Sequence, residues 1–250
     1  MMVSLFAFIF AFTIIVLVHE FGHFIAARKA GVKAYEFSIG FPFSPKIITL
    51  FRHKETEFTL RLLPLGGFVS FSKEGAGESV DLFNTSYFNR ALIMSAGSVF
   101  NILFAFLIFI LVFVFGKHYP LSESISMSAN TVWEVFAGTA GFFFDLFSGN
   151  GTAEGLAGPL GIASLAGKAA GKGFISLLYF SGFLSISLGI INLLPLPALD
   201  GGHLFMLLIE ALRRKPLSLK IHQTVSVVGI LLFIILTVFV TYRDIARLVA

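Results

Sequence analysis

The sequence predicts an α-helical integral membrane protein, and its composition is the first reason. Of its 250 residues, 56% are hydrophobic and only 13% are charged, and phenylalanine alone occurs 32 times. Soluble domains carry about 25% charged residues, and the mean hydropathy of +0.91 points in the same direction. The second reason is that four segments are apolar over the length that crosses a bilayer, about 20 residues.

The four predicted spans divide the chain into loops. They are residues 3–27, 91–116, 174–197 and 224–242. The first Lys or Arg in the chain is Arg28, so the first span lacks the positively charged start of a signal peptide. We therefore expect a retained helix there, and a single polytopic membrane domain over residues 1–250.

Charges in the loops predict the orientation of the spans. Nine Lys and Arg residues separate the first and second spans, three separate the second and third, and four separate the third and fourth. Because loops rich in Lys and Arg stay in the cytoplasm, the first and third loops are expected inside and both termini outside. Arg243 and Arg247, after the last span, argue mildly for the opposite orientation. The expected surroundings are the lipid bilayer, and no basic and aromatic cluster indicates nucleic-acid binding.

Three shorter segments lie between the spans. Residues 46–71 place β-branched and aromatic residues around a polar turn, which predicts a membrane-associated β-hairpin ended by Pro64 and two glycines. Residues 117–131 are expected to form a short loop on the outer face. Residues 130–149 are apolar but contain two acidic side chains, so we expect an interfacial helix and not a fifth span.

The first span ends in a metal-binding pattern, His19-Glu20-Phe21-Gly22-His23. Ionisable residues inside a membrane helix are costly and therefore mark functional sites. Residues i and i+4 share one helix face, so both imidazoles can reach one metal ion, with Glu20 beside them as general base. The chain has no cysteine, which excludes thiolate ligands, and imidazole and carboxylate ligands favour Zn²⁺. The alternative is a helix end at which His and Glu merely meet water or headgroups.

A catalytic zinc site uses three protein ligands, so the two histidines need a third ligand. Asp200 is the strongest candidate for it. The third span breaks at Pro195 and Pro197 and then presents this carboxylate. Irregular backbone at membrane depth is tolerated only where it is buried in protein or lines a wet cavity. The alternative is that Asp200 is simply the N-cap of the next helix. The unmatched histidine pair favours the metal, and so does the predicted position of His23 and Asp200 at one cytoplasmic edge.

Three motifs follow one another in an order that a known family shares. They are HEFGH in the first span, SAGSVFN in the second and NLLPLPALDGG after the third. With them the chain resembles the site-2 protease family, the intramembrane zinc metalloproteases of regulated proteolysis. The segments GVKAYEFSIGF, LPLGGFV and GPLGIA are similar to its bacterial sigma-E-regulating branch. The resemblance implies that His19, His23 and Asp200 bind zinc and that Glu20 is the catalytic base.

The resemblance also implies a substrate class and a location. Proteases of this kind hydrolyse peptide bonds in or near the transmembrane segment of single-pass membrane proteins, such as anti-sigma factors or remnant signal peptides. Their location would be the bacterial inner membrane, with the active site toward the cytoplasm. One alternative is a metal-binding or ion-transport membrane protein, for which an internal repeat is expected and none is visible. The other alternative is an inactive relative that binds membrane partners. The intact HExxH motif argues against this alternative.

Six residues are candidate contacts to the substrate. They are Asn192, Pro195, Pro197, Phe58, Thr59 and Leu60. In the family, the region of Asn192 helps to hold the substrate, and an ordinary interhelical hydrogen bond is the alternative. Asn101 in the second span has the same two interpretations. The hairpin strand 58–63 is expected either to pair with an unwound substrate by strand addition or to form a small capping sheet.

Two features depart from the family pattern. Ser98 follows the glycine of the second-span motif, where the family usually has proline. The sigma-E branch carries one or two PDZ domains between its second and third spans, and here only residues 117–131 occupy that place. Such a segment cannot form a domain, since chains under about 40 residues rarely fold alone. The chain is therefore a compact form of the family, either natural or produced by deletion.

Overall fold

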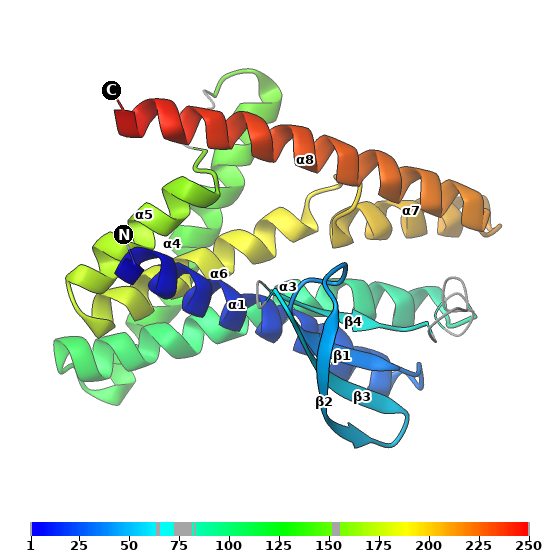
Figure 1. The fold of residues 1–250 in the computed structure, drawn as a ribbon, viewed down its shortest axis with the longest axis horizontal. Coiled ribbons are helices and arrows are strands. Elements are labelled where there is room, and N and C mark those ends of the chain that lie inside the picture. Colours follow the sequence, from blue (N-terminus) through cyan, green and yellow to red (C-terminus); the bar gives the residue numbers. More distant parts are fainter. Residues whose placement is uncertain (1, 64–65, 73–81, 83, 152–155, 250) are drawn as a thin grey trace. The chain divides into compact units, whose positions relative to one another are not determined.

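The computed structural model describes residues 2–63, 66–72, 82, 84–151 and 156–249, and Figure 1 shows their course. Pro64 of the predicted hairpin lies outside the described residues. In chain order the elements are α1 (Met2–Lys29), β1 (Glu36–Ile39), β2 (Lys46–His53), β3 (Thr56–Arg61), β4 (Gly67–Ser70), α3 (Tyr87–Leu111), η1 (Val112–Gly116), α4 (Leu121–Ser148), α5 (Pro159–Gly171), α6 (Phe174–Leu193), α7 (Asp200–Arg213) and α8 (Leu219–Val249).

Four helical segments of the described chain are long and apolar enough to cross a membrane, as the sequence predicts. They are Ser4–Lys29, Tyr87–Gly116, Phe174–Leu193 and Lys220–Ala246. The third is shorter than expected, because Pro195 lacks an amide N–H and disfavours helical backbone at the residue before it. The chain is therefore an α-helical membrane protein with one small sheet.

The segment between the second and third spans is helical where a loop was expected. Residues 121–131 form the first turns of α4, so the predicted outer loop is wrong there. Glu123 lies in the first turn, where a negative charge is favourable beside the helix N-terminus. Gly149 ends the helix in the left-handed conformation, with φ of 80°. The interfacial helix expected at 130–149 is thus the second part of a longer helix.

The four strands form one sheet with the order β2-β3-β1-β4. β2 and β3 pair antiparallel and form the predicted hairpin, with His53 opposite Thr56. β1 pairs with β3 in parallel and with β4 in antiparallel fashion. β3 is therefore an interior strand with both edges paired, so the expectation that residues 58–63 accept a substrate strand is wrong. The free edges of this sheet belong to β2 and β4.

The chain forms two compact units, each assembled from segments that are distant in sequence. One consists of Met1–Ala11, Ile102–Ile190 and Ile230–Ala250. The other consists of Phe12–Asn101 and Ile191–Gly229. The second unit contains the end of α1, the sheet and α7, and with them the predicted metal ligands.

Each unit has an apolar core of its own. In the first unit, Phe109 is fully buried and packs with Ile186 and other side chains of one cluster. In the second unit, Ala27, Val32 and Ile93 form a buried cluster at the end of α1. The second cluster fixes the end of α1, which carries the histidines, against α3.

Candidate metal centre

Two histidines of α1 and one aspartate of α7 converge in the second unit. Nε2 of His19 lies 3.0 Å from Oδ2 of Asp200 and 3.2 Å from Nε2 of His23. Nε2 of His23 lies 3.2 Å from the same aspartate oxygen. His19 and His23 are about one turn apart, so both imidazoles leave the same face of α1. Side chains separated by 181 residues in sequence thus form a compact triangle of donor atoms.

The size of this triangle fits a zinc ion. Zinc binds imidazole nitrogen at about 2.0–2.1 Å in a tetrahedral arrangement, so neighbouring donors lie about 3.3 Å apart. The observed separations of 3.0 to 3.2 Å are close to that value. Two imidazoles and one carboxylate are also a donor set of catalytic zinc sites, in which the fourth position takes water or substrate.

The second nitrogen of each imidazole is also held in place. Nδ1 of His23 donates to the carbonyl oxygen of Ile93 at 2.7 Å, which turns Nε2 toward His19 and Asp200. Nδ1 of His19 lies 3.4 Å from the side-chain amide of Asn101, which is fully buried. Such outer partners fix the orientation of metal-binding histidines. Asn101 therefore makes an interhelical contact, as one of its two interpretations predicts, and a contact with substrate stays a prediction.

Gly97 on α3 provides the space that the histidines occupy. A Cβ atom at this position would lie 2.5 Å from Nε2 of His23 and 2.7 Å from Nε2 of His19. Both values are far below van der Waals contact, so any side chain here would displace the imidazoles. The sequence reasoning did not identify Gly97 as a site residue, although it lies in the SAGSVFN motif. Only the close approach of α3 to α1 reveals its role.

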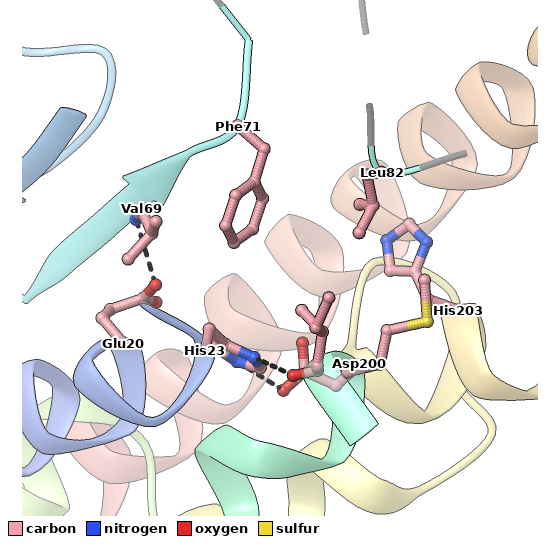
Figure 2. Close-up of a pocket in the computed structure, with 9 residues that line it drawn as sticks. Glu20, His23, Val69, Phe71, Leu82, Asp200 and His203 are labelled. Atoms are coloured by element: carbon pink, nitrogen blue, oxygen red, sulfur yellow. Dashed lines mark hydrogen bonds and ion pairs between the residues drawn. The ribbon is translucent and has the colours of Figure 1, made fainter. Parts of the chain in front are cut away.

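Asp200 is the first residue of α7 and not its N-cap, which is Leu199. The N-cap alternative is therefore wrong. The carboxylate of Asp200 contacts both histidines, and Figure 2 shows it beside His23. Burial raises the pKa of Asp200, but hydrogen bonds with His19 and His23 outweigh burial and hold this pKa below its usual range. A Cβ at Gly201 would overlap the carbonyl groups of the broken backbone at Leu193 and Leu194. The glycine lets α7 begin against that backbone.

Glu20 lies beside the donor triangle, but its carboxylate is hydrogen-bonded to strand β4. Its Oε2 accepts a hydrogen bond from the backbone amide of Val69 at 3.1 Å. Figure 2 shows its carboxylate turned toward β4, with His23 and Asp200 on its other side. Val69 lies on the free edge of β4, opposite Phe37 of β1. The sheet therefore positions the predicted general base.

One cavity joins these groups. It has a volume of about 250 Å³, well above the roughly 30 Å³ that one water occupies. Its polar lining comes from Glu20, His23, Asp200 and His203, and its apolar lining from Val69, Phe71, Leu82, Ile93 and Met94. The cavity therefore has room for water and a peptide group beside both the carboxylate of Glu20 and the donor triangle.

Comparison with known proteins identifies the family. Residues 7–236 match the profile of Peptidase family M50, so the match covers nearly the whole chain. This chain belongs to peptidase family M50, the site-2 protease family. It is therefore a zinc metalloprotease, as the HExxH motif and the donor triangle indicate.

Individual relatives of this M50 peptidase are named as proteases or metalloproteases. The regulator of sigma-W protease RasP of Bacillus subtilis is 36% identical over 138 residues, which are 54% of this chain and 33% of RasP. The chloroplastic membrane metalloprotease ARASP of Arabidopsis thaliana is 26% identical over 347 residues, covering 93% of this chain and 76% of ARASP. A protein of Nostoc sp., named as a candidate zinc metalloprotease, is 27% identical over 98% of this chain and 96% of its own length.

The Nostoc alignment also shows that this M50 peptidase is compact. The alignment is 354 residues long, whereas the chain has 250 residues. The excess corresponds to gaps in this chain, so the relative carries internal segments that this chain lacks. The alignment length does not locate these segments, so the absence of a PDZ domain between the second and third spans stays a prediction.

The structure does not bring the six candidate substrate contacts to the cavity of this M50 peptidase, since none of them lines it. Thr59 is fully buried and donates to the carboxylate of Glu36 at 2.5 Å. Phe58 packs against Phe51 and Phe37, and Leu60 is paired on both sides of β3. The other three lie at the end of α6 and in the break after it; they are Asn192, Pro195 and Pro197. Their contact with substrate stays a prediction.

Proposed function

We propose that this M50 peptidase cleaves membrane-spanning segments, with His19, His23 and Asp200 as the zinc ligands and Glu20 as the general base. One observation carries the proposal. The donor atoms of the three ligands lie within 4.8 Å of one another, and Glu20 lines the same cavity as His23 and Asp200. Family membership supplies the metal and the reaction class.

The chemistry of peptide hydrolysis divides between the metal and Glu20. Zinc with three protein ligands polarises a carbonyl and lowers the pKa of water to about 7. Glu20 takes a proton from the attacking water and passes it to the nitrogen of the leaving amine. The Val69 amide holds the carboxylate at the cavity wall, 3.1 Å from its Oε2. The position of Glu20 therefore depends on β4.

The substrate is proposed to bind as an extended strand along β4. A transmembrane helix satisfies its own backbone hydrogen bonds, so its peptide groups must be unwound before attack. An extended segment regains these bonds at a free sheet edge. β4 borders the cavity through Val69, and among the described residues it pairs only with β1. β4 therefore replaces β3 as the strand expected to bind substrate.

Single-pass transmembrane proteins are the proposed substrates. The name of the Bacillus subtilis relative, regulator of sigma-W protease, supports anti-sigma factors as one class. Remnant signal peptides, which are short transmembrane helices, are the second class. Asn192, Pro195 and Pro197 remain proposed contacts at the helix break that precedes Asp200.

The proposed location is the bacterial inner membrane, with the metal site toward the cytoplasm. The loop between the first two spans carries nine Lys and Arg residues, against three in the following loop. This asymmetry favours a cytoplasmic position for the sheet and for the adjoining end of α1. Cleavage products would leave on that side.

Cleavage of a synthetic transmembrane substrate by the purified chain in detergent tests the proposal. We expect wild-type protein to cleave and Glu20→Gln to be slower by about 10²–10⁴-fold, since general acid–base catalysis contributes that much. Both proteins should bind about one zinc per chain, because a catalytic site uses three protein ligands and Glu20 is not among them.

Three results would each contradict one part of the proposal: the substrate, the role of Glu20 or the ligand set. Zinc binding without cleavage, over a panel of anti-sigma-factor and signal-peptide segments, would refute the proposed cleavage of membrane-spanning segments. Loss of zinc from Glu20→Gln would show that Glu20 is a ligand and not the base. Full zinc occupancy in His19→Ala or Asp200→Ala would refute the ligand set.

A further inference from the structure

His203 is the polar group of the cavity that the proposed mechanism does not use. It lies on α7, one turn after Asp200, so the helix that places the proposed ligand also places this imidazole. It is not part of the donor triangle. Figure 2 shows Glu20 and His203 on opposite sides of the cavity, with His23 and Asp200 between them.

The ring of His203 differs from the buried imidazoles of this unit, which are those of His19, His23 and His222. His19 and His23 use both ring nitrogens, and His222 contacts Glu210 at 3.0 Å. For His203, no hydrogen bond of either ring nitrogen is found within the residues that the structure describes. His203 lines the cavity, so a bound molecule can reach this residue.

The surroundings of His203 favour its neutral form. Burial lowers the pKa of this imidazole below its ordinary value of 6.5. A neutral imidazole carries one N–H donor and one acceptor nitrogen. The cavity therefore holds a carboxylate acceptor on one side and a hydrogen-bond donor on the other.

We propose that His203 is a catalytic residue, whose ring N–H donates to the carbonyl oxygen of the scissile peptide bond as negative charge develops there. The inference rests on the proposed function, because it needs a peptide bound between Glu20 and His203. Donors placed where charge develops stabilise the transition state more than the substrate. His203 supplies such a donor on the face of the cavity that Glu20 does not occupy.

Replacement of His203 tests the assignment in the purified full chain, with the transmembrane segment that wild type cleaves as substrate. His203→Phe removes the donor and retains the ring. We expect kcat to fall by about 10²–10³-fold, as for loss of one oxyanion donor, with KM, bound zinc and thermal stability close to wild type. His203→Gln restores a neutral N–H donor and should recover at least part of the rate. His53→Gln, an exposed histidine of β2, is the matched control.

A tetrahedral inhibitor separates catalysis from mere packing. A phosphinic peptide that spans the same cleavage site resembles the tetrahedral state, so its affinity should fall in parallel with kcat/KM across the variants. Retention of the wild-type rate by His203→Phe would refute the proposal. Zinc loss or destabilisation in both variants would assign His203 to the structure of the site and refute it as well. If wild type itself binds zinc without cleaving, the proposed function fails first, which distinguishes the two failures.

Discussion

At the scale of single residues, Gly97 is important because the absence of a side chain leaves space for His19 and His23. We expect Gly97→Ala to weaken zinc binding at least as much as loss of an outer hydrogen bond, which costs about 10–100-fold. The reason is the overlap of the new methyl group with both Nε2 atoms, at 2.5 and 2.7 Å. Zinc affinity of the purified variant, measured by competition with a chelator, checks this.

The chain offers matched controls for this substitution. A Cβ at Gly138 or Gly141 meets no atom of the described structure within 4 Å. Gly138→Ala and Gly141→Ala should therefore keep wild-type zinc affinity. An unchanged affinity in Gly97→Ala would contradict the close approach of α3 to the histidines.

Asp200 shows how far local sequence alone can identify a metal ligand. Its position after Pro195 and Pro197 made it a candidate ligand, but an aspartate at the start of a helix is equally typical of an N-cap. Local sequence contains no information on the distance to His19, which is 181 residues away. The 3.0 Å contact between the two side chains supports the proposal that Asp200 is a ligand.

At the scale of elements, a buried ion pair joins the helices that surround the site. Arg90 of α3 contacts Glu210 of α7 at 2.6 Å, and His222 of α8 contacts the same carboxylate at 3.0 Å. All three side chains are almost fully buried. The pair thus connects α7, which carries Asp200, to α3, which carries Gly97.

Breaking this pair should destabilise the protein strongly. We expect Glu210→Ala to lower the unfolding free energy by about 3–5 kcal/mol, because the buried Arg90 then loses this counter-charge. Equilibrium unfolding in detergent micelles checks this. Lys46→Ala, which breaks the more exposed Lys46–Glu57 pair, should cost less than about 1 kcal/mol. A Glu210→Leu/Arg90→Leu variant that is less stable than either single variant would contradict the argument.

The lowered pKa of Glu210 predicts how acid changes the stability of the protein. Burial raises the pKa of Glu210, but hydrogen bonds from His222, the Leu217 amide and Arg90 outweigh it, so this pKa lies below 4.5. A lowered pKa gives stability that is complete above the unfolded value and is lost as pH falls through the folded value. Wild type should therefore lose stability below about pH 4.5 more steeply than Glu210→Gln. Parallel pH curves of the two proteins would contradict this.

The sheet shows the limit of strand prediction. The composition of residues 46–71 was enough to predict the β2–β3 hairpin, since alternation and turn residues are local signals. Local signals do not show which strands become neighbours of a hairpin. β1 comes from the segment before it and pairs with β3. The free edge beside the cavity therefore belongs to β4.

At the scale of the whole molecule, the loop charges predict the orientation in the membrane. The chain has no cysteine, so single cysteines report their own position without background. We expect Lys172→Cys to react with an impermeant maleimide in intact cells, because its loop is predicted outside. His53→Cys and Lys215→Cys should react only after the membrane is opened. The reverse pattern would place the metal site on the outer side.

The sequence by itself determined the membrane class, the four spans, the paired histidines with Glu20, and the family. These features depend on composition over about 20 residues and on helix periodicity over about one turn, both of which are local. Tertiary structure alone decided that Asp200 faces the histidines, that Gly97 makes room for them, that β4 and not β3 offers a free edge, and that His203 borders the cavity. These features are contacts between segments distant in sequence, which depend on how helices and strands pack and not on the residues at either end alone.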